Sequence, residues 1–378
     1  MSTGGESVAR CLILDRSASD QENHREREPG EDMKITEVRI TEQRRAELVD
    51  GTLDAKVGPG DLLIRTEHSG VSSGTELAVY TGLHQWIADP NYPDWAFPFP
   101  AGYSACGVIE EIGDGVSSFS VGQRVVIPGK HRSHAIHPAV AVEPTDGCWL
   151  VPDGVPSEVA AFGCIIRYGW GAAARVGTTM GRSVFVQGLG IVGQGAVRAF
   201  AAAGAYPVIG LDPMANRRDT ALSGGATACL DPTDGGFADT ASKLLGGEPL
   251  ADIVADASGA PAGVVQAMSL TQEGGQCVIV GSPRGLADAV NFYPDLHKRC
   301  IEVIGAHGDY LWWNLGARLG WDVDKAMNWI LCQFGTGRMV AGDVPTATFA
   351  PSEAQSVYDM LLNDKDRIVS AAFDWSRD

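Results

Sequence analysis

The sequence predicts an α/β protein made of a β-rich unit and a doubly wound domain on a parallel sheet. Three observations support this fold class. Short strand patterns alternate with glycine turns from residue 33 onward, apolar runs alternate with amphipathic segments after about residue 156, and a glycine-rich loop follows one of those runs. Fully apolar strands that alternate with helices are typical of a parallel sheet covered on both faces.

Residues 1–32 differ from the rest of the chain. The stretch 17–32 is almost free of apolar residues, so it cannot bury enough surface to become ordered. We expect a disordered N-terminal tail or an over-long start that precedes a natural start at Met33. An arm that binds a partner is the functional alternative.

The β-rich unit is expected at residues 33–159. Its strand patterns are bounded by Gly, Asp or Pro, and they cover Lys34–Ile40, Asp61–His68, Gly107–Ile112 and Arg124–Ile127. An insert at Gly82–Pro100 carries five aromatic residues among four prolines. This insert is either a surface loop that packs its own aromatic side chains or a lip over a substrate cleft.

The doubly wound domain is expected at residues 160–305, followed by a return segment at 306–378. The buried strands are predicted at Val184–Val186, Pro207–Leu211, Ala251–Val254, Gln276–Val280 and Ile301–Ile304. The return segment contains two helical patterns and a final strand that should rejoin the β-rich unit, at Asp322–Gln333, Pro351–Leu362 and Arg367–Phe373.

Composition excludes several classes of protein. The net charge of −18 argues against nucleic-acid binding, which requires a basic face. No apolar run reaches the roughly 18 residues that span a bilayer, so no membrane partner is expected. The eight cysteines are scattered and form no CxxC pair, which excludes a zinc ribbon and favours a reducing, cytoplasmic location.

A dinucleotide-binding loop is predicted directly after the strand at Val184–Val186. Gly188, Gly190 and Gly193 form G-x-G-x-x-G, and a helical run, Ile191–Ala203, follows. The glycines allow a tight turn, a close approach of the backbone to a pyrophosphate, and close packing of helix on strand. The free N–H groups at the start of the helix then face the phosphates. The loop residues Leu189, Ile191 and Val192 therefore belong to the candidate cofactor site.

Other candidate cofactor residues lie at the ends of neighbouring strands. Asp212 lies 19 residues after Gly193, where a carboxylate accepts hydrogen bonds from ribose hydroxyls and repels a 2′-phosphate. This favours NAD(H) over NADP(H), although Arg217 and Arg218 follow closely and keep NADP(H) possible. Two further strand ends contribute Ser258, Val280 and Gly281. A degenerate fold without a cofactor is the alternative.

From Met33 onward the chain resembles the medium-chain dehydrogenase/reductase superfamily, the relatives of zinc alcohol dehydrogenase. The segment Gly102–Val125, GYSACGVIEEIGDGVSSFSVGQRV, is similar to the family signature GHE-x-x-G-x-V-x-x-x-G…V-x-x-x-x-x-G-D-x-V, and the glycine-rich loop follows at the expected distance. The resemblance implies a GroES-like catalytic domain, a Rossmann domain, a cofactor cleft between them, and a homodimer or homotetramer formed through the last Rossmann strands.

The chain departs from this family at the zinc ligands. The resemblance places the three ligand positions at Ser72, Tyr103 and Cys164, and the neighbouring Glu position at Ser104. A catalytic zinc needs three good protein ligands and a water, which a hydroxyl, a phenol and one thiol do not supply. The four-cysteine structural lobe expected after Val125 is missing as well. We therefore expect no metal.

Without zinc, a hydrogen-bond donor must stabilise the developing oxyanion. Tyr103 is the candidate: its phenol donates to a substrate oxygen and, with a lowered pKa, relays a proton, or it merely fills the vacated zinc pocket. Glu76 orients a substrate hydroxyl, acts as a base, or is a charge in the first turn of a helix. Ser72, Thr75 and Cys164 would line the same pocket. Arg167 binds an anion or the cofactor phosphates, or pairs with an acidic neighbour.

Two other clusters have open interpretations. His131, His134 and His137 are spaced three residues apart. They lie in a segment predicted to form strands and turns, where alternate residues point to opposite faces, so the three side chains do not share one face. The three histidines have structural roles, act as a catalytic acid or relay, or form a metal site. Tyr310, Trp312 and Trp313 follow the last Rossmann strand and either pack in an oligomer contact or stack on a sugar, cyclitol or planar ring.

The leading hypothesis is a zinc-independent oxidoreductase that transfers hydride to or from a ketone or secondary alcohol of a cyclic oxygenated metabolite. The segments SSGTELAVYTG and FPFPAGYSACG resemble a GTE-type subgroup that includes bacteriochlorophyllide a dehydrogenase and natural-product pathway dehydrogenases, which suggests secondary metabolism. The alternatives are an enone or iminium reductase, a cofactor-binding protein without catalysis, and a zinc enzyme with unusual ligands.

Overall fold

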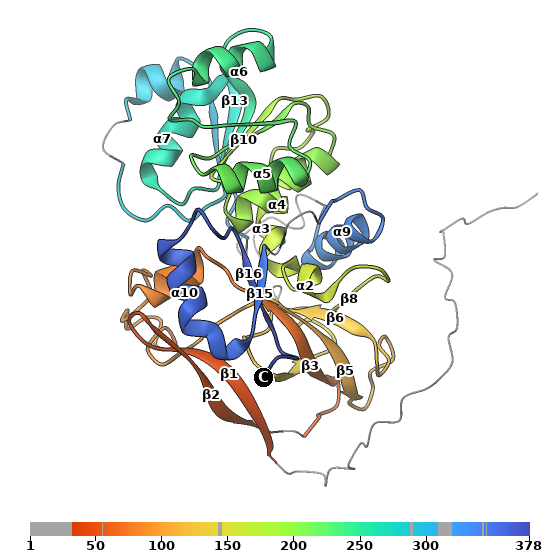
Figure 1. Cartoon of the computed structure of the whole chain (residues 1–378). Coiled ribbons are helices and arrows are strands. Elements are labelled where there is room, and N and C mark those ends of the chain that lie inside the picture. Colours follow the sequence, from red (N-terminus) through yellow and green to blue (C-terminus); the bar gives the residue numbers. More distant parts are fainter. Residues whose placement is uncertain are drawn as a thin grey trace, which may run out of the picture.

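The chain folds into two lobes, an upper lobe around a parallel sheet and a lower, β-rich lobe (Figure 1). The computed structural model describes residues 32–54, 56–142, 146–287, 290–308, 320–341, 344 and 346–378. The interpretations of residues 1–31 and of Tyr310, Trp312 and Trp313 lie outside the described residues.

The upper lobe contains six parallel strands in the order β11-β10-β9-β12-β13-β14. Their bounds are β9 Val184–Gln187, β10 Val208–Leu211, β11 Ala228–Leu230, β12 Ala251–Asp256, β13 Thr271–Ile279 and β14 Glu302–Gly305. Counted from β9, this is the order 3-2-1-4-5-6 of a Rossmann fold, whose direction of winding reverses between β9 and β12. The predicted doubly wound fold is confirmed, and ligands are expected at the carboxyl ends of these two strands.

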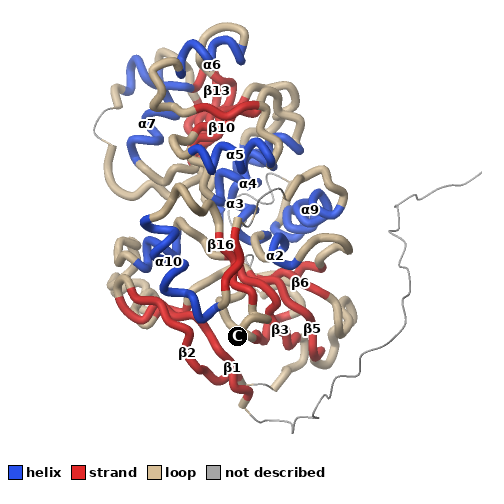
Figure 2. The backbone as a smooth tube through the Cα atoms, in the orientation of Figure 1, coloured by secondary structure: helices blue, strands red, loops and turns tan. Residues whose placement is uncertain are grey.

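Helices cover both faces of this sheet (Figure 2). The helices are α4 Ile191–Ala202, α5 Ala215–Ser223, α6 Phe237–Leu245 and α7 Pro261–Leu270, and a π-helical turn, η1 Tyr293–His297, precedes β14. The central strands are buried because they are covered on both sides, as the continuous apolar run of β9 requires. The helix predicted after the glycine loop begins at Ile191 as expected.

The lower lobe is built from two sheets. The smaller has the order β2-β1-β4 and the larger has the order β15-β16-β3-β5-β6-β8, with β7 paired to β3. Their bounds are β1 Met33–Glu42, β2 Arg45–Leu53, β3 Asp61–Gly70, β4 Phe99–Pro100, β5 Ala105–Ile112, β6 Arg124–Ile127, β7 His134–Pro138, β8 Trp149–Leu150, β15 Ala347–Phe349 and β16 Ala371–Asp374. Two short helices belong to the same lobe, α1 Thr75–Tyr80 and α2 Ser157–Ala160.

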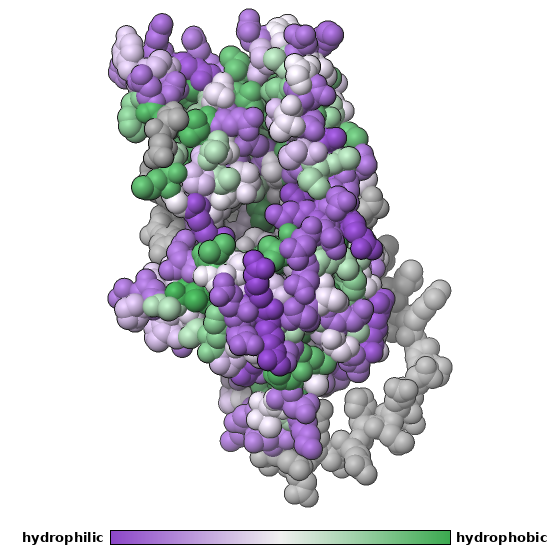
Figure 3. All heavy atoms as spheres, turned by 60° about the vertical axis from the view of Figure 1, so that its left-hand side comes forward, coloured by the Kyte–Doolittle hydropathy of each residue, from purple (hydrophilic) through white to green (hydrophobic). Residues whose placement is uncertain are grey.

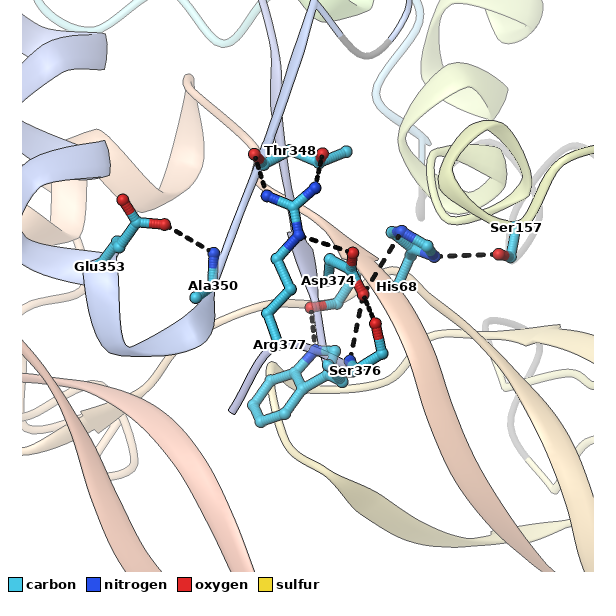
Figure 4. A network of polar contacts seen from close by, with 10 residues as sticks. His68, Ser157, Thr348, Ala350, Glu353, Asp374, Ser376 and Arg377 are labelled. Carbon is cyan, nitrogen blue, oxygen red and sulfur yellow. Dashed lines mark hydrogen bonds and ion pairs between the residues drawn. The ribbon is translucent and has the colours of Figure 1, made fainter.

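The return segment completes the lower lobe, as its final strand pattern predicts. It supplies α9 Val323–Gly335, the 3₁₀ turn η2 Pro351–Glu353, α10 Ala354–Asn363 and the strand β16. β16 pairs antiparallel with β3, although it begins four residues later than predicted. Polar contacts join the end of this strand to its neighbours (Figure 4): Arg377, whose Nε lies 2.9 Å from Asp374 Oδ2, donates to Thr348 on β15, and His68 Nε2 on β3 lies 3.9 Å from Asp374 Oδ1. His68 on β3 binds Ser157, which begins α2.

Close helix packing joins the two lobes. The helix α3, Gly163–Arg175, lies against α4, and a Cβ at Gly169 would stand 2.3 Å from the Ala196 amide nitrogen. Only glycine permits this approach. It therefore fixes the position of α3 relative to α4, the helix that follows the glycine loop. The largest hydrophobic cluster accordingly includes residues of both lobes, such as Val126 and Val186.

The aromatic insert packs largely on itself, as one of its two interpretations predicts. Trp95 stacks on His84 with ring centroids 4.2 Å apart, and Trp86 stacks on Tyr92 at 4.6 Å. In the part of the chain described, no helix is long and apolar enough to cross a membrane. The seven cysteines there are all free thiols.

Candidate active site

The glycine loop between β9 and α4 has the geometry of a phosphate-binding turn. Gly188 has a φ of +81°, and a Cβ there would lie 2.7 Å from Ser258 Cα. A Cβ at Gly193 would lie 1.9 Å from the Gly188 carbonyl oxygen, whereas a Cβ at Gly190 would meet no atom within 4 Å. The first and third glycines are thus required by packing, and the second leaves open space where a pyrophosphate approaches the backbone.

Asp212 lies immediately after β10 and is held by this loop. One carboxylate oxygen accepts the Leu189 amide at 2.8 Å and lies 3.3 Å from Arg217 Nη1, and the other accepts the Met214 amide at 2.8 Å. A carboxylate has about four acceptor positions, so three are already used by the protein. Asp212 therefore shapes the glycine loop and keeps about one position for a ribose hydroxyl.

The ends of β12 and β13 meet beside the loop, as predicted. The Gly281 amide donates to the Asp256 carbonyl oxygen at 2.9 Å, and a Cβ at Gly281 would lie 2.7 Å from the Gly259 nitrogen. This brings Ser258, Val280 and Gly281 together at the carboxyl edge of the sheet. Sequence reasoning missed Asp256, a fully buried carboxyl whose pKa is raised by burial. An acidic residue that ends an apolar strand was the available signal.

Ser72 and Tyr103 form a direct hydrogen bond in the lower lobe. The Tyr103 hydroxyl donates to Ser72 Oγ at 2.5 Å. The ring of Tyr103 packs against the hydrophobic cluster that spans both lobes and lies edge-on to Tyr168, with ring centroids 6.1 Å apart. Ser72 and Tyr103 stand at two of the positions that the family resemblance assigns to zinc ligands. Here they bind each other, next to the junction of the lobes.

The ionisation of Tyr103 differs from the sequence-based expectation. Burial raises its pKa well above 10, and Tyr168 and Glu76 raise it further, whereas hydrogen bonds with Ser72 and Thr75 lower it. The expected relay through a phenol of lowered pKa is thus not supported, because the apolar surroundings disfavour the phenolate. At neutral pH Tyr103 is a hydrogen-bond donor.

Glu76 lies in the first turn of α1 and is almost completely buried. One oxygen accepts the Ser72 amide at 2.7 Å. The other oxygen accepts from the Tyr358 hydroxyl at 2.5 Å and lies 3.0 Å from His131 Nε2. Burial alone would raise the pKa of Glu76, but His131, Tyr358 and the Ser72 amide together lower it. Glu76 is therefore an internal carboxylate that positions Ser72, and no substrate is needed to satisfy it.

His131 continues this network toward the C-terminus. Its Nδ1 lies 2.8 Å from Ser69 Oγ, and the Trp375 indole N–H donates to the same hydroxyl at 2.9 Å. The Ser69 hydroxyl hydrogen is then available to donate to Nδ1 of His131. His131 therefore carries its ring hydrogen on Nε2 and donates it to Glu76. No sequence pattern predicts this network, in which five segments of the chain meet.

The three histidines do not converge on a metal. His134 Nδ1 lies 3.2 Å from Ser133 Oγ, and His137 Nε2 donates to the Gly147 carbonyl at 3.0 Å. His131 contacts Ser69 and Glu76 instead. Within the described ranges, no group of three or more His, Cys, Asp or Glu side chains is arranged to hold a metal ion. Their separate partners match the structural interpretation.

The third zinc position, Cys164, is fully buried in the first turn of α3. Its amide donates to Ser104 Oγ at 3.2 Å, which links the start of α3 to the residue after Tyr103. Arg167, one turn later, is buried and its guanidinium lies over the Tyr168 ring at 5.6 Å. The sites of Cys164 and Arg167 therefore adjoin the Tyr103 region through Ser104 and Tyr168.

The two cavities that stand out on the surface lie away from these residues. The larger, about 600 Å³, is lined by residues such as Ser183, Pro207 and Asp252 at the amino ends of the parallel strands. The second, about 310 Å³, adjoins β8 and α9. The candidate site is instead assigned from the glycine loop and the Tyr103 contacts, because ligands of this fold bind at the carboxyl ends of the strands.

Comparison with known families decides the assignment. An alcohol dehydrogenase GroES-like domain matches residues 58–176, and a zinc-binding dehydrogenase domain matches residues 192–310, so the two together span more than half of the chain. The chain belongs to the medium-chain dehydrogenase/reductase superfamily. It is an NAD(P)-dependent oxidoreductase that acts on alcohols or ketones.

Individual medium-chain relatives are distant in sequence. The chain is 26% identical to L-threonine 3-dehydrogenase of Pyrococcus abyssi over 303 residues, which covers 72% of this chain and 83% of the relative. It is 27% identical to human sorbitol dehydrogenase over 275 residues, covering 65% and 73%.

Solved structures of the same fold cover most of the chain. A zinc-binding dehydrogenase of Sinorhizobium meliloti bound to NADP has a TM-score of 0.70 at 20% identity, with 90% of this chain and 99% of the other covered. An Escherichia coli alcohol dehydrogenase complexed with NADH has a TM-score of 0.73 at 14% identity and the same coverage. These likenesses support the fold of this medium-chain enzyme.

Proposed function

We propose that this enzyme reduces a ketone without zinc and that the Tyr103 hydroxyl takes over the polarising role of the metal. The observation that carries the proposal is the 2.5 Å hydrogen bond from Tyr103 to Ser72, because these residues occupy two of the three positions that the resemblance assigns to zinc ligands. A protonated phenol there can donate to a substrate oxygen as negative charge develops on it.

The donor set does not fit a catalytic zinc. Tetrahedral zinc takes thiolate, imidazole and carboxylate ligands. Here one position is the Tyr103 phenol, which burial keeps protonated, and the second is the Ser72 hydroxyl that accepts its hydrogen. Only Cys164 remains as a thiol. We therefore derive no step through a metal.

The chemistry follows from the state of Tyr103. A bound reduced nicotinamide supplies a hydride to an electrophilic carbon. As a carbonyl carbon receives hydride and its oxygen becomes an alkoxide, the Tyr103 hydroxyl turns its single hydrogen from Ser72 Oγ to that oxygen and donates it, and solvent then returns a proton to Tyr103. The raised pKa keeps Tyr103 protonated at neutral pH, which is the state that donates. Glu76 and the Ser72 backbone hold the hydroxyl partner of Tyr103 in place.

For the substrate we propose a cyclic oxygenated metabolite, such as a sugar or cyclitol, in secondary metabolism. Relatives that are named as sorbitol and L-threonine dehydrogenases act on polar, hydroxylated molecules, and the subgroup resemblance suggests a natural-product pathway. Reduction of an enone or iminium is the second candidate, because a conjugated acceptor needs no metal for activation. The polar Ser72, Thr75 and Tyr103 argue against a non-catalytic protein.

Turnover with cofactor deuterated at the transferred position separates the two reactions. We expect deuterium on the carbon that bears the new hydroxyl group. Deuterium on the carbon β to a carbonyl, found by NMR of the product, would instead assign the enzyme to the enone reductases.

We propose a preference for NAD(H) that depends on Asp212. Replacing Asp212 by Ser should weaken NADH binding and narrow the ratio of NADH to NADPH affinity, because it removes a ribose acceptor and releases Arg217 from its 3.3 Å contact to bind a 2′-phosphate. Fluorescence titration with both cofactors measures this ratio. Lys243→Ser, on the exposed end of α6, is the control, and an unchanged ratio in the Asp212 variant would refute the assigned role.

Self-association is proposed to use the β14 edge of the Rossmann sheet, whose other edge strand is β11. Val303 on this strand and Phe292 and Tyr293 before it are exposed apolar side chains, as a homodimer or homotetramer interface requires. The free thiols suit the reducing cytoplasm that we propose as the location.

A further inference from the structure

A buried acid and a buried amide meet at the base of the glycine turn. Asp256 ends β12 and Gln187 ends β9, and the two residues are partners in the parallel register of these strands. Gln187 Nε2 donates to Asp256 Oδ1 at 3.1 Å and to the Gly263 carbonyl at 2.9 Å. A recess separates the lobes at the surface (Figure 3), but only 0% of Asp256 and 4% of Gln187 are exposed. Their polar atoms therefore need partners within the protein.

One acceptor on each of these side chains has no hydrogen-bond partner among the described residues. The two atoms are Asp256 Oδ2 and Gln187 Oε1. The orientation of the Gln187 amide is fixed, because its Nε2 faces the Gly263 carbonyl, which can only accept. Turning the amide over would place two oxygens against each other. Two buried acceptors in one contacting pair thus lack a hydrogen, which is unfavourable.

Asp256 differs from another aspartate on the same strand. Asp252, near the start of β12, uses both of its oxygens: Oδ2 accepts the Ser183 amide at 2.8 Å and the Ser183 hydroxyl at 2.7 Å, and Oδ1 accepts the side-chain amide of a glutamine on β13. At Asp256 the donors gather on Oδ1 alone, which accepts from Gln187 and from the Ser258 N–H. One oxygen that accepts beside one without a donor is the pattern of a carboxylic acid.

The surroundings of Asp256 disfavour a negative charge. Burial raises its pKa, against hydrogen bonds from Ser258 and Gln187 that lower it, and no basic side chain in the described part of the chain offsets the burial. The neighbouring β9 and α7 contain no charged residue. From β13 comes the Cys277 thiol, whose pKa is raised to about 12 by burial and by Asp256. This thiol is uncharged at neutral pH and does not stabilise a carboxylate.

A carboxylate at this position would also oppose the cofactor. Gln187 directly precedes Gly188, and the turn packs on Ser258, since a Cβ at Gly188 would lie 2.7 Å from the Ser258 nitrogen. The pyrophosphate of a dinucleotide approaches this turn and is attracted by the N–H groups at the start of α4. An ionised Asp256 would repel those phosphates across a poorly solvated region. A neutral acid avoids this repulsion.

We propose that Asp256 is a neutral carboxylic acid at pH 7, with its hydrogen on Oδ2 directed to Gln187 Oε1, and that this acid–amide pair positions the Gly188 turn for the dinucleotide. A single hydrogen then serves both of the atoms that lack a partner. Asp256 is a positioning residue, because it is buried behind the turn. The inference is independent of the proposed ketone reduction, since it concerns only the binding of the cofactor.

Infrared difference spectra between the wild type and Asp256→Asn at pH 7 test the protonation directly. We expect the wild type to show the carbonyl band of a protonated carboxyl, and absence of this band would overturn the proposal. Asn reproduces the acid, because its Nδ2 donates where the acid does. The folded chain must keep a proton that the unfolded chain releases above about pH 4. Asp256→Asn should therefore unfold at the wild-type temperature or higher at pH 8.

Asp252→Asn is the matched control, since it makes the same change on the same strand. It should lower the unfolding temperature, because an amide has one acceptor atom where Asp252 uses two. An Asp256→Asn protein that is destabilised as much as Asp252→Asn would show that Asp256 is a carboxylate and would contradict the proposal.

NADH titration across pH tests the positioning role. At pH 7 Asp256→Asn should bind NADH as tightly as the wild type, whereas Asp256→Ala should bind about tenfold more weakly, because it loses the hydrogen bonds that hold the turn. At higher pH the wild-type affinity should fall only where the infrared band disappears, by up to about tenfold per pH unit for one proton, and the Asn variant should not follow. Loss of the band without loss of affinity, or an Asn variant as weak as the Ala variant, would refute this role.

Discussion

Tyr103→Phe should lower the turnover of ketone reduction by about 100- to 10,000-fold, the contribution of a positioned acid. The variant loses the hydroxyl that donates to Ser72 at 2.5 Å but keeps the ring that packs beside Tyr168. Cofactor affinity should not change, because the glycine loop and Asp212 belong to the other lobe. Steady-state kinetics and NADH titration separate the two effects.

Ser72→Ala is the matched variant for this test. It removes the acceptor of the Tyr103 hydrogen but leaves the phenol, so turnover should fall less than in Tyr103→Phe. Because the pKa of Tyr103 is raised well above 10, reduction by the wild type should show no loss of activity from this group as the pH rises from 7 to about 9. A fully active Tyr103→Phe enzyme would show that the ring only fills the pocket.

Glu76→Ala should lower the free energy of unfolding by about 3 kcal/mol or more, because it leaves three buried hydrogen-bond donors without an acceptor, at about 1–3 kcal/mol each. The change removes the hydrogen-bond acceptor of His131, of the Tyr358 hydroxyl and of the Ser72 amide. Glu76→Gln should cost less, because an amide oxygen still accepts one of these hydrogen bonds. Denaturant unfolding measures both.

The pH dependence gives this prediction a second readout. The folded-state pKa of Glu76 lies below its ordinary value, so its stabilising effect is present above the unfolded-state pKa and is lost as the pH falls through the folded-state pKa. The stability gap between wild type and Glu76→Gln should therefore shrink in acid. Glu47→Gln, which breaks an exposed pair with Arg45, should change stability little. A Glu76→Ala protein as stable as the wild type would contradict the buried network.

The cofactor side of the molecule was predictable because its signals are local. The glycine spacing, the apolar strand before it and Asp212 after the next strand lie within about 30 residues of each other. Gly188 and Gly193 are required by close packing, and Gly190 leaves space for a pyrophosphate. The alternation of strands and helices predicted the doubly wound fold but not its strand order. The strand β11 was missed, because its three residues, Ala228–Leu230, form too short an apolar run. The return strand β16 begins four residues later than its pattern predicted.

The catalytic side depends on contacts between distant segments. Glu76 meets His131 across 55 positions and Tyr358 across 282, and no periodicity encodes such pairs. The partnership of Ser72 and Tyr103 was placed only by the family resemblance, and the raised pKa of Tyr103 depends on burial that sequence does not reveal.

The zinc content of the purified enzyme, measured by elemental analysis together with NADH-dependent ketone reduction before and after chelation, tests the central claim most directly. We predict far less than about one zinc per subunit and turnover that chelation leaves unchanged, because Tyr103 polarises the carbonyl. About one tightly held zinc per subunit, with activity lost on its removal and restored by its return, would contradict the account.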